Sequence, residues 1–467
     1  GLGSVDVEFT GNAATITLAE AKSLTNANAG TSGHVTAIVQ SRTIAQLAST
    51  ANAGQANEAI TLQIDPGNKF DLTISDTTFD SEHLKEVLAL DAATTGTITL
   101  SGDNAGTGSP KITGTIAQLK AAYQSFDVAT GAVKGIDNIG SSILEVVIAT
   151  DEVISAADLK YLNGLTDQTI IFSGLGGDNT ISGTNADLVN VFTSGVHTAI
   201  EGATIGATVT DTITAAEQVT LDGLTAGIIT ATISDTTYTG KLSTIADRGA
   251  TDHNLTITLD DASVNAADVI ALVAKTSGLI TVNTSELKGS NADVATVLGH
   301  NNGTGVVTGL SSTPLTVNAG ANTALADANT INGLTSGPIT ATITEDNITT
   351  LAGLQGTGNN YTITVATPSV NASALNALNA KTTAVITVNS TTITGFLSDI
   401  KTAYDANTNG EFTGLGTETV TITDTGTVLA SDLSDVNLLT AGAVNAASAT
   451  AVKGSLSDLI KVYTNSA

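Results

Sequence analysis

A chain of 467 residues exceeds the size that one hydrophobic core normally serves, so we expect several domains or an array of repeats. Its formal charge of −28, from 16 basic and 44 acidic residues, disfavours nucleic acid and anionic membrane surfaces as partners. The absence of cysteine excludes disulfides and thiolate sites, and no apolar run approaches the roughly 20 residues that a membrane-spanning helix needs, so we expect no membrane insertion.

Residues 1–210 are predicted to hold divergent copies of a short repeat. Copies open near Ile16 and near Phe79, and the segment 153–172 (VISAADLKYLNGLTDQTIIF) has the pattern of a strand followed by a helix. A strand pattern begins at about Val5 with no polar segment before it, and the sequence contains no methionine that could initiate translation. We therefore expect the chain to be a fragment of a longer protein.

Residues 211–467 are predicted to form more regular units of about 51–59 residues. Residues 213–230 match residues 264–281 at a shift of 51, and residues 255–283 match residues 361–389 without a gap at a shift of 106. The units are thus paired into a 106-residue period.

Each regular unit is expected to contain a strand and a short helix, and then both again. Residues 255–259 (LTITL) alternate apolar and polar side chains as a half-buried strand does, and residues 265–275 have a helical apolar face that includes Leu272. Gly278 is predicted to end this helix. Leu272 and Leu378 should then occupy the same core position in two units, as should Ile280 and Ile386.

Such small units bury little surface alone, which favours stacking. We predict a β-rich repeat protein with short helices, a right-handed parallel β-solenoid of strand-plus-short-helix coils. About sixteen half-units at roughly 4.8 Å per strand would make one continuous rod on the order of 75 Å long. The alternative is a string of small α/β repeat domains.

Three segments carry a resemblance to a known group of proteins, namely VNAADVIALVAKT (264–276), GSNADVATVL (289–298) and ADANTINGLTSGPITATITEDN (326–347). They resemble repeats of giant secreted surface proteins of cyanobacteria and other aquatic bacteria, a group that includes S-layer-like proteins and adhesins and is often associated with RTX calcium repeats. The resemblance implies an exported protein at the cell surface. The long RTX array typical of that group is missing here.

Calcium is the one cofactor that the residues suggest. Residues 173–183 (SGLGGDNTISG) resemble one RTX turn in which Asp178 would bind Ca²⁺, although a glycine-rich turn without metal explains them too. Acidic residues also recur where strands end, and stacked coils would align them into a column that Ca²⁺ could bridge; they are Asp235, Asp260, Asp261, Glu345 and Asp346, with Asp76 and Asp424 as further members. The alternative is that each caps the helix that follows it.

A second acidic row lies in the first turn of the predicted helices, where the helix dipole favours negative charge, so we assign it to helix stability. Its members are Glu20, Asp158, Glu217, Asp268, Asp327 and Asp432. The five histidines have no HExxH spacing, and no GxSxG, Walker or dinucleotide-binding motif occurs. We therefore expect no enzyme.

The leading hypothesis is a structural, self-assembling extracellular protein of a bacterial surface layer, sheath or filament, with itself as the main partner. The alternative is an adhesin or glycan-binding module that recognises surface polysaccharide. Its binding residues would lie in the divergent part, where longer loops at 55–69 and 102–111 interrupt the repeat. Assembly of so acidic a chain is expected to depend on divalent cations more than on monovalent salt.

Overall fold

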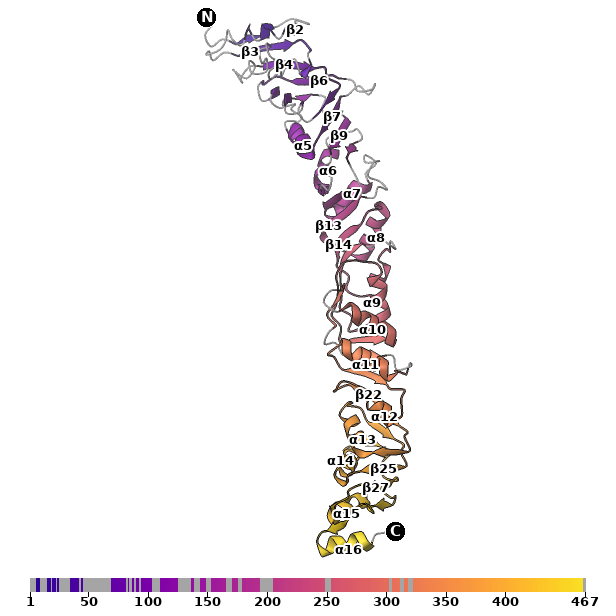
Figure 1. Ribbon diagram of the computed structural model, residues 1–467. Coiled ribbons are helices and arrows are strands. Elements are labelled where there is room, and N and C mark those ends of the chain that lie inside the picture. Colours follow the sequence, from indigo (N-terminus) through magenta and orange to yellow (C-terminus); the bar gives the residue numbers. More distant parts are fainter. Residues whose placement is uncertain are drawn as a thin grey trace. The chain divides into compact units, whose positions relative to one another are not determined.

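The computed structural model describes residues 6–8, 15–17, 19–21, 23–24, 34–41, 43–44, 69–80, 83, 86–87, 90–91, 94–102, 110–124, 136–137, 143–147, 153–164, 170–174, 179–193, 205–247, 253–301, 305–310, 315–317 and 322–464. The chain forms two compact units, Gly1–Thr232 and Ile233–Ala467. Figure 1 shows their strands and short helices, and each unit is described by itself below.

Unit 1 contains short parallel sheets and short helices. One sheet has the order β1-β3-β4-β6-β8, with β2 also paired to β3; its strands are β1 (Val7–Glu8), β2 (Thr15–Ile16), β3 (Val35–Val39), β4 (Lys69–Ile74), β6 (Ile98–Leu100) and β8 (Ile136–Asp137). A second has the order β11-β9-β7-β5, built from β5 (Thr78–Phe79), β7 (Lys111–Gly114), β9 (Ile143–Val147) and β11 (Ile171–Ser173). A third row runs β10-β12-β13-β14, built from β10 (Val153–Ser155), β12 (Thr180–Gly183), β13 (Gly206–Ile213) and β14 (Ile229–Ile233). The helices with described bounds are α5 (Ile116–Gln124), α6 (Ala156–Asn163), α7 (Asn185–Thr193) and α8 (Ala215–Leu224).

Unit 2 repeats this arrangement more regularly. Its strand rows are β15-β17-β19, β16-β18-β20-β21-β22-β24-β26, β23-β25-β27-β29 and β28-β30. The strands are β15 (Asn254–Leu259), β16 (Ser263–Asn265), β17 (Ile280–Val282), β18 (Glu286–Gly289), β19 (Val307–Thr308), β20 (Leu315–Val317), β21 (Ile339–Thr342), β22 (Asn360–Val365), β23 (Ser369–Asn371), β24 (Ile386–Val388), β25 (Thr392–Gly395), β26 (Phe412–Thr413), β27 (Thr419–Ile422), β28 (Thr427–Leu429), β29 (Val444–Asn445) and β30 (Ala451–Lys453). The helices are η1 (Leu242–Thr244), α9 (Ala266–Val273), α10 (Asn291–His300), α11 (Leu325–Leu334), α12 (Ile348–Leu351), α13 (Ala372–Asn379), α14 (Leu397–Thr408), α15 (Ala430–Leu439) and α16 (Leu456–Thr464).

The positions of the buried residues follow from the periodicity of each strand and helix. In β22 the side chains of Tyr361, Ile363 and Val365 are buried, and the three residues that alternate with them are exposed. In α13 the buried residues, Ala372, Leu375 and Leu378, are spaced by three, as expected for one face of a short helix. Every strand pair whose register is described is parallel, for example β15 with β17 and β22 with β24. The protein is therefore β-rich, with several short parallel sheets and short helices.

The two segments that match at a shift of 106 residues have the same structure. Ile280 pairs with Ile257, and Ile386 pairs with Ile363, each in the same parallel register. Leu272 and Leu378 are both buried at the seventh position of their helices. The predicted equivalence of these core positions is confirmed.

A buried threonine joins successive coils, where a coil is one strand with the helix or turn that follows it. The Thr276 hydroxyl accepts hydrogen bonds from the backbone N–H of Leu255, in the preceding coil, at 2.7 Å and from that of Gly278 at 2.9 Å. It lies 2.9 Å from the carbonyl oxygen of His253, to which it donates. Comparable joints are made by Thr94, Thr225, Thr382 and Thr440. The hydroxyl supplies a partner for buried backbone groups at the turn.

The prediction that Gly278 ends a helix is wrong. Helix α9 ends at Val273 with Ala274 as its cap, four residues before Gly278. A Cβ atom at Gly278 would lie 2.2 Å from the carbonyl oxygen of Leu255, so the glycine is required because two coils approach closely there. Three further joints place a glycine equally close to a backbone carbonyl oxygen: Gly96, Gly227 and Gly442.

Candidate functional site

The strand-end acids were the residues that the sequence singled out, and in several coils they accept a hydrogen bond from the coil before. In each contact, a side-chain oxygen accepts a hydrogen bond from a backbone N–H that lies 19 to 32 residues earlier in the chain, at a distance of 2.6 to 3.0 Å. The strand-end acids make four such pairs: Asp76 with Ile44, Asp261 with Tyr238, Glu345 with Leu325, and Asp424 with Leu397. Asp211, within β13, and Thr367 were not predicted but make the same contact, with Asn185 and Ile348. We call this contact the inter-coil cap.

The inter-coil cap differs from the helix cap that the sequence suggested. Leu325 and Leu397 are the first residues of α11 and α14, whose N-terminal N–H groups lack partners inside the helix. Glu345 and Asp424 therefore cap the helix before them rather than the helix after them. Neither helix has a side-chain bond from its own N-cap residue. The next coil supplies this missing acceptor.

Two of the predicted calcium ligands have other polar partners. Asp235 forms an ion pair with Lys241, with the ammonium nitrogen 2.8 Å from Oδ1. The exposed Asp260 accepts from the side-chain amide of Asn283 at 3.1 Å. Asn283 follows the strand next to the one that Asp260 follows. The expected column of carboxylates is therefore interrupted by an amide at this place.

Asp261 and Asp268, one from each acidic row, lie near enough to interact electrostatically. Asp261 accepts from the backbone N–H of Tyr238 at 3.0 Å, and Asp268 lies in the first turn of α9. Partial burial, and next the charge of Asp261, raise the pKa of Asp268. The pKa of Tyr238 is also raised, first by burial and then by the charge of Asp268. Asp261 and Asp268 therefore place two negative charges near one another.

Glu345 and Asp346 lie together after β21 but differ in their contacts. The Glu345 carboxylate accepts from the backbone N–H of Leu325 and from the Thr344 hydroxyl. Asp346 is exposed, and its backbone carbonyl oxygen accepts from the N–H of Ala366 at 2.9 Å. Asp346 thus leaves its carboxylate facing solvent.

The remaining metal candidate, Asp178, lies outside the described residues, as do most of the loops 55–69 and 102–111. Within the part of the chain that the structure describes, three or more histidine or acidic side chains do not gather in a group that could hold a metal ion. A calcium ion at Asp260 or Asp346 would therefore need further ligands from elsewhere, because Ca²⁺ takes six to eight oxygens.

The second acidic row pairs between neighbouring helices, which the sequence analysis did not foresee. Lys120 lies 2.5 Å from Asp158, and Lys160 lies 2.7 Å from Asp187. Each lysine is the fifth residue of its helix, and each acid is the third residue of the next helix. The Lys160 ammonium lowers the pKa of Asp187.

The same ladder recurs in unit 2. Lys401 of α14 contacts Asp432 at 3.3 Å and Asp435 at 3.0 Å, both in α15. The hydrogen bonds to Asp435 and Asp432, in that order, raise the pKa of Lys401. In another step the link comes from an amide at the first helix position, where Asn291 of α10 donates to Asp327 of α11. The second acidic row therefore links neighbouring helices, in addition to lying in the first helical turn, where the helix dipole favours negative charge.

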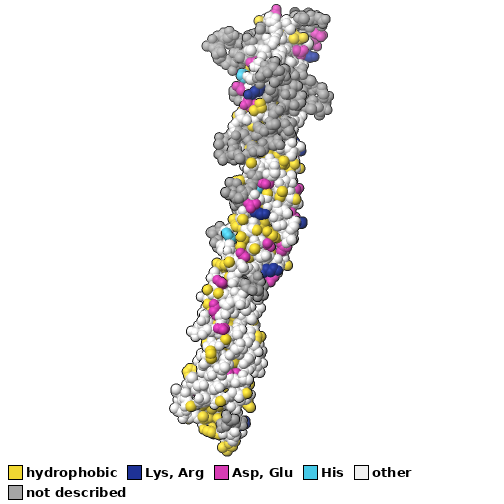
Figure 2. All heavy atoms as spheres, turned by 90° about the vertical axis from the view of Figure 1, so that its right-hand side faces the viewer, with side chains coloured by type: hydrophobic (Ala, Val, Ile, Leu, Met, Phe, Trp, Pro, Cys, Tyr) yellow, Lys and Arg dark blue, Asp and Glu magenta, His cyan; other side chains and the backbone are white. Residues whose placement is uncertain are grey.

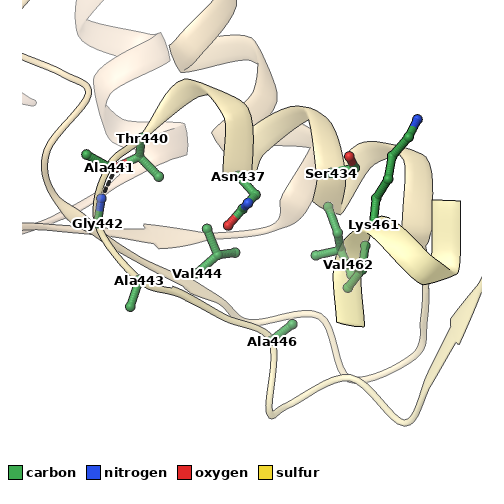
Figure 3. A pocket seen from close by; sticks show the side chains of 11 residues that line it. Ser434, Asn437, Thr440, Ala441, Gly442, Ala443, Val444, Ala446, Lys461 and Val462 are labelled. Atoms are coloured by element: carbon green, nitrogen blue, oxygen red, sulfur yellow. Dashed lines mark hydrogen bonds between the residues drawn. The ribbon is translucent and has the colours of Figure 1, made fainter. Parts of the chain in front are cut away.

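A pocket of about 300 Å³ lies between α15, the turn after it and α16. Asn437 and Val444 point toward its interior in Figure 3, and the bond from the Gly442 N–H to the Thr440 hydroxyl closes one side. The Lys461 side chain borders the pocket and extends away from it. Its lining is small and mostly neutral, without a set of groups suited to acid–base chemistry.

No family model, curated protein or solved structure matches this chain. None of the helices in the described ranges combines the length and apolar character needed to cross a membrane. The proposals below therefore rest on the residues and geometry of this chain.

Proposed function

We propose that this chain is a structural, non-enzymatic protein that self-associates outside the cell, as part of a bacterial surface layer, sheath or filament. The observation that carries the proposal is the recurrence of the same joint between coils. The buried threonine and the inter-coil cap both recur in unit 1 and in unit 2, at Thr225 and Asp211 and at Thr276 and Asp261. Recurrent contacts of this kind are typical of a scaffold.

Within each unit the coils are proposed to follow a parallel β-solenoid. Support comes from strand rows whose neighbours are parallel and from helices that contact in chain order, as α13, α14, α15 and α16 do (Figure 1). Such stacking lets each coil bury its apolar face against the next. A repetitive surface of this type suits lattices and filaments because identical contacts can be repeated.

Calcium is proposed to assist association between copies. At −28 charges per chain, two copies repel one another, and monovalent salt only screens that repulsion. The carboxylates of Asp260 and Asp346 are exposed and have no lysine or arginine partner among the described residues. Calcium could take two such carboxylates from different copies and complete its coordination with water.

The test is sedimentation velocity and electron microscopy of the full chain with calcium, with a chelator, and with a monovalent salt at equal ionic strength. Calcium should promote association, and the chelator should reverse it. Asp260→Asn with Asp346→Asn should weaken the calcium response, whereas Asp235→Asn, which removes an acid already paired with Lys241, should not. A chain that remains monomeric in every condition would contradict the proposed function.

A further inference from the structure

Four asparagines of the chain are followed directly by glycine. They are Asn163, Asn302, Asn332 and Asn409. Glycine has no Cβ, so the backbone nitrogen after such an asparagine is open to attack on the carbonyl carbon of the asparagine side chain. Asn302 lies outside the described residues, and the fold holds the other three in different ways.

Asn163 and Asn332 are restrained by their helices. Asn332 is the eighth of the ten residues of α11; it is half-buried, and its Oδ1 accepts from the side-chain amide of Asn359 at 3.2 Å. Asn163 is the last residue of α6, and its Oδ1 is buried. The N–H of Gly164, which follows it, donates to two carbonyl oxygens of the helix at 3.1 Å. A reaction at either place requires a helical turn to open and a partly buried side chain to leave its site.

Asn409 differs from both because it follows a helix and its side chain is exposed. Helix α14 ends at Thr408, and Asn409 is its C-terminal cap, with φ −75° and ψ −5°. The Asn409 side chain has no hydrogen-bond partner among the described residues. Gly410 is exposed in the left-handed region at φ 82°, and a Cβ atom there would meet nothing within 4 Å. The Asn409 side chain is therefore free to turn toward the Gly410 nitrogen.

The turn around Gly410 is held by three backbone hydrogen bonds. The N–H groups of residues 409–411 donate to carbonyl oxygens of residues 405–407, in the last turn of α14, at 2.9 to 3.1 Å. The terminal turn of a helix opens at a much lower free energy than the buried core of a fold. Opening of this turn frees the Gly410 nitrogen while the rest of α14 stays packed.

We propose that Asn409 is a site of spontaneous chemical modification, at which its side-chain amide is lost and aspartate or isoaspartate is formed. The Gly410 nitrogen bonds to Cγ of Asn409, the bond between Cγ and Nδ2 breaks, and ammonia leaves with the proton of the Gly410 amide. Water then adds to one of the two carbonyl carbons of the five-membered ring and breaks the bond from that carbon to the ring nitrogen. Addition at the side-chain carbonyl carbon gives aspartate, and addition at the backbone carbonyl carbon gives isoaspartate.

The modification weakens a contact between two coils. Either product places a carboxylate at the C-terminus of α14, where the helix dipole disfavours negative charge. Figure 2 shows acidic side chains more often than basic ones, in keeping with the acidic sequence, so the new charge adds to existing repulsion. Isoaspartate also lengthens the backbone just before Glu411, whose carbonyl oxygen accepts from the N–H of Ile386 at 3.0 Å. That bond joins β26 to β24, so a displaced turn loosens this joint.

Mass spectrometry of peptides from the full chain, after incubation in mildly alkaline buffer, tests the site. Modification at Asn409 should be faster than at Asn163 and at least about tenfold faster than at Asn332, since about 1.4 kcal/mol of extra opening free energy suffices for a tenfold difference in rate. Asn407 is an internal control, because the side chain of Thr408 shields the nitrogen that follows it. Asn409→Gln keeps an amide at the position and should give no acidic form there. The inference is overturned if Asn409 stays intact, or if Asn163 or Asn332 is modified as fast.

Hydrogen exchange tests the effect on the joint. Anion exchange separates the modified chain by its added charge, and the Ile386 amide should exchange about tenfold faster in it than in the parent chain, which corresponds to a loss of about 1.4 kcal/mol in local opening. Ile280 is the matched control, because its N–H makes the corresponding bond to the Val306 carbonyl oxygen at 2.7 Å, and its exchange should not change. Equal exchange at Ile386 in both forms would refute the effect on the joint. Neither experiment depends on self-association, so their failure would leave the proposed function standing.

Discussion

Replacing Thr276 by valine tests whether the buried hydroxyl holds two coils together. Valine has nearly the same shape, so the substitution removes the hydroxyl without opening a large cavity. The N–H groups of Leu255 and Gly278, which lie 2.7 and 2.9 Å from that oxygen, would lose their acceptor inside a buried turn. Each such orphaned group costs about 1–3 kcal/mol.

The expected loss is therefore about 3 kcal/mol in the free energy of unfolding of unit 2, after about 0.8 kcal/mol is returned by the added methyl group. Urea unfolding followed by circular dichroism measures the total, and hydrogen exchange at the Leu255 and Gly278 amides shows whether the loss is local. Thr258→Val is the matched control, because Thr258 lies on the outer side of β15, where its hydroxyl has no hydrogen-bond partner among the described residues. If the two variants differ by less than about 0.5 kcal/mol, the joint does not act as described.

Four further substitutions have expected effects on stability that differ in sign or in pH dependence. Leu272→Ala should lower the free energy of unfolding by about 2–5 kcal/mol, because the side chain is fully buried, and thermal unfolding would detect it. Tyr361→Phe should raise stability by about 1 kcal/mol, because it removes a buried hydroxyl that has no partner among the described residues, whereas Tyr404→Phe should lower it, because that hydroxyl donates to a buried carboxylate. The Lys111 ammonium lowers the pKa of Glu145. The ionised carboxylate therefore stabilises the fold fully at pH values above its ordinary pKa of 4.5, and this contribution is lost as the pH falls through the lowered pKa. Glu145→Gln should accordingly cost about 1 kcal/mol at pH 7 and progressively less in acid, and equal costs at pH 7 and pH 3 would contradict the assignment.

The elements themselves could be predicted because their signals are local. Alternation in LTITL and YTITV specifies which strand residues face inward, and the spacing of Val269 and Leu272 specifies one helix face. The repeat then predicts which residues are equivalent, as for Leu272 and Leu378. Parallel pairing also follows, because a strand, a helix and a second strand in one sheet require a crossover.

The contacts between coils could not be predicted, because they depend on how one coil is placed against the next. Asp424 has the residue type of a helix cap, and nothing near it in the sequence says that its partner is Leu397 rather than a residue that follows. Thr276 resembles an ordinary turn residue, although the spacing of threonine two residues before glycine recurs at Thr94, Thr225, Thr335 and Thr440 and could have been noticed. The helix ladder left a similar signal in the lysine two residues after Asp158 and Asp399.

The calcium ligands were predicted from residue type and position alone, and the structure places them in different surroundings. Asp235 is neutralised by Lys241, while Asp261 and Glu345 have an inter-coil N–H. Asp260 and Asp346 keep exposed carboxylates. Residue type cannot distinguish these cases, because the partners come from segments about 6 to 23 residues away in the chain.

Because of the inter-coil cap, a whole coil is the smallest piece of sequence that can be added or removed without leaving a helix N-terminus without its acceptor. A cut between Leu397 and Asp424 separates a helix start from its acceptor, and an insertion that shifts Asp424 would leave the same N–H without one. Duplication of a complete coil, in contrast, supplies a new helix start together with the acid that serves its neighbour. The chain can therefore lengthen by duplication of whole coils, and the shifts of 51 and 106 residues are what such growth would leave in the sequence.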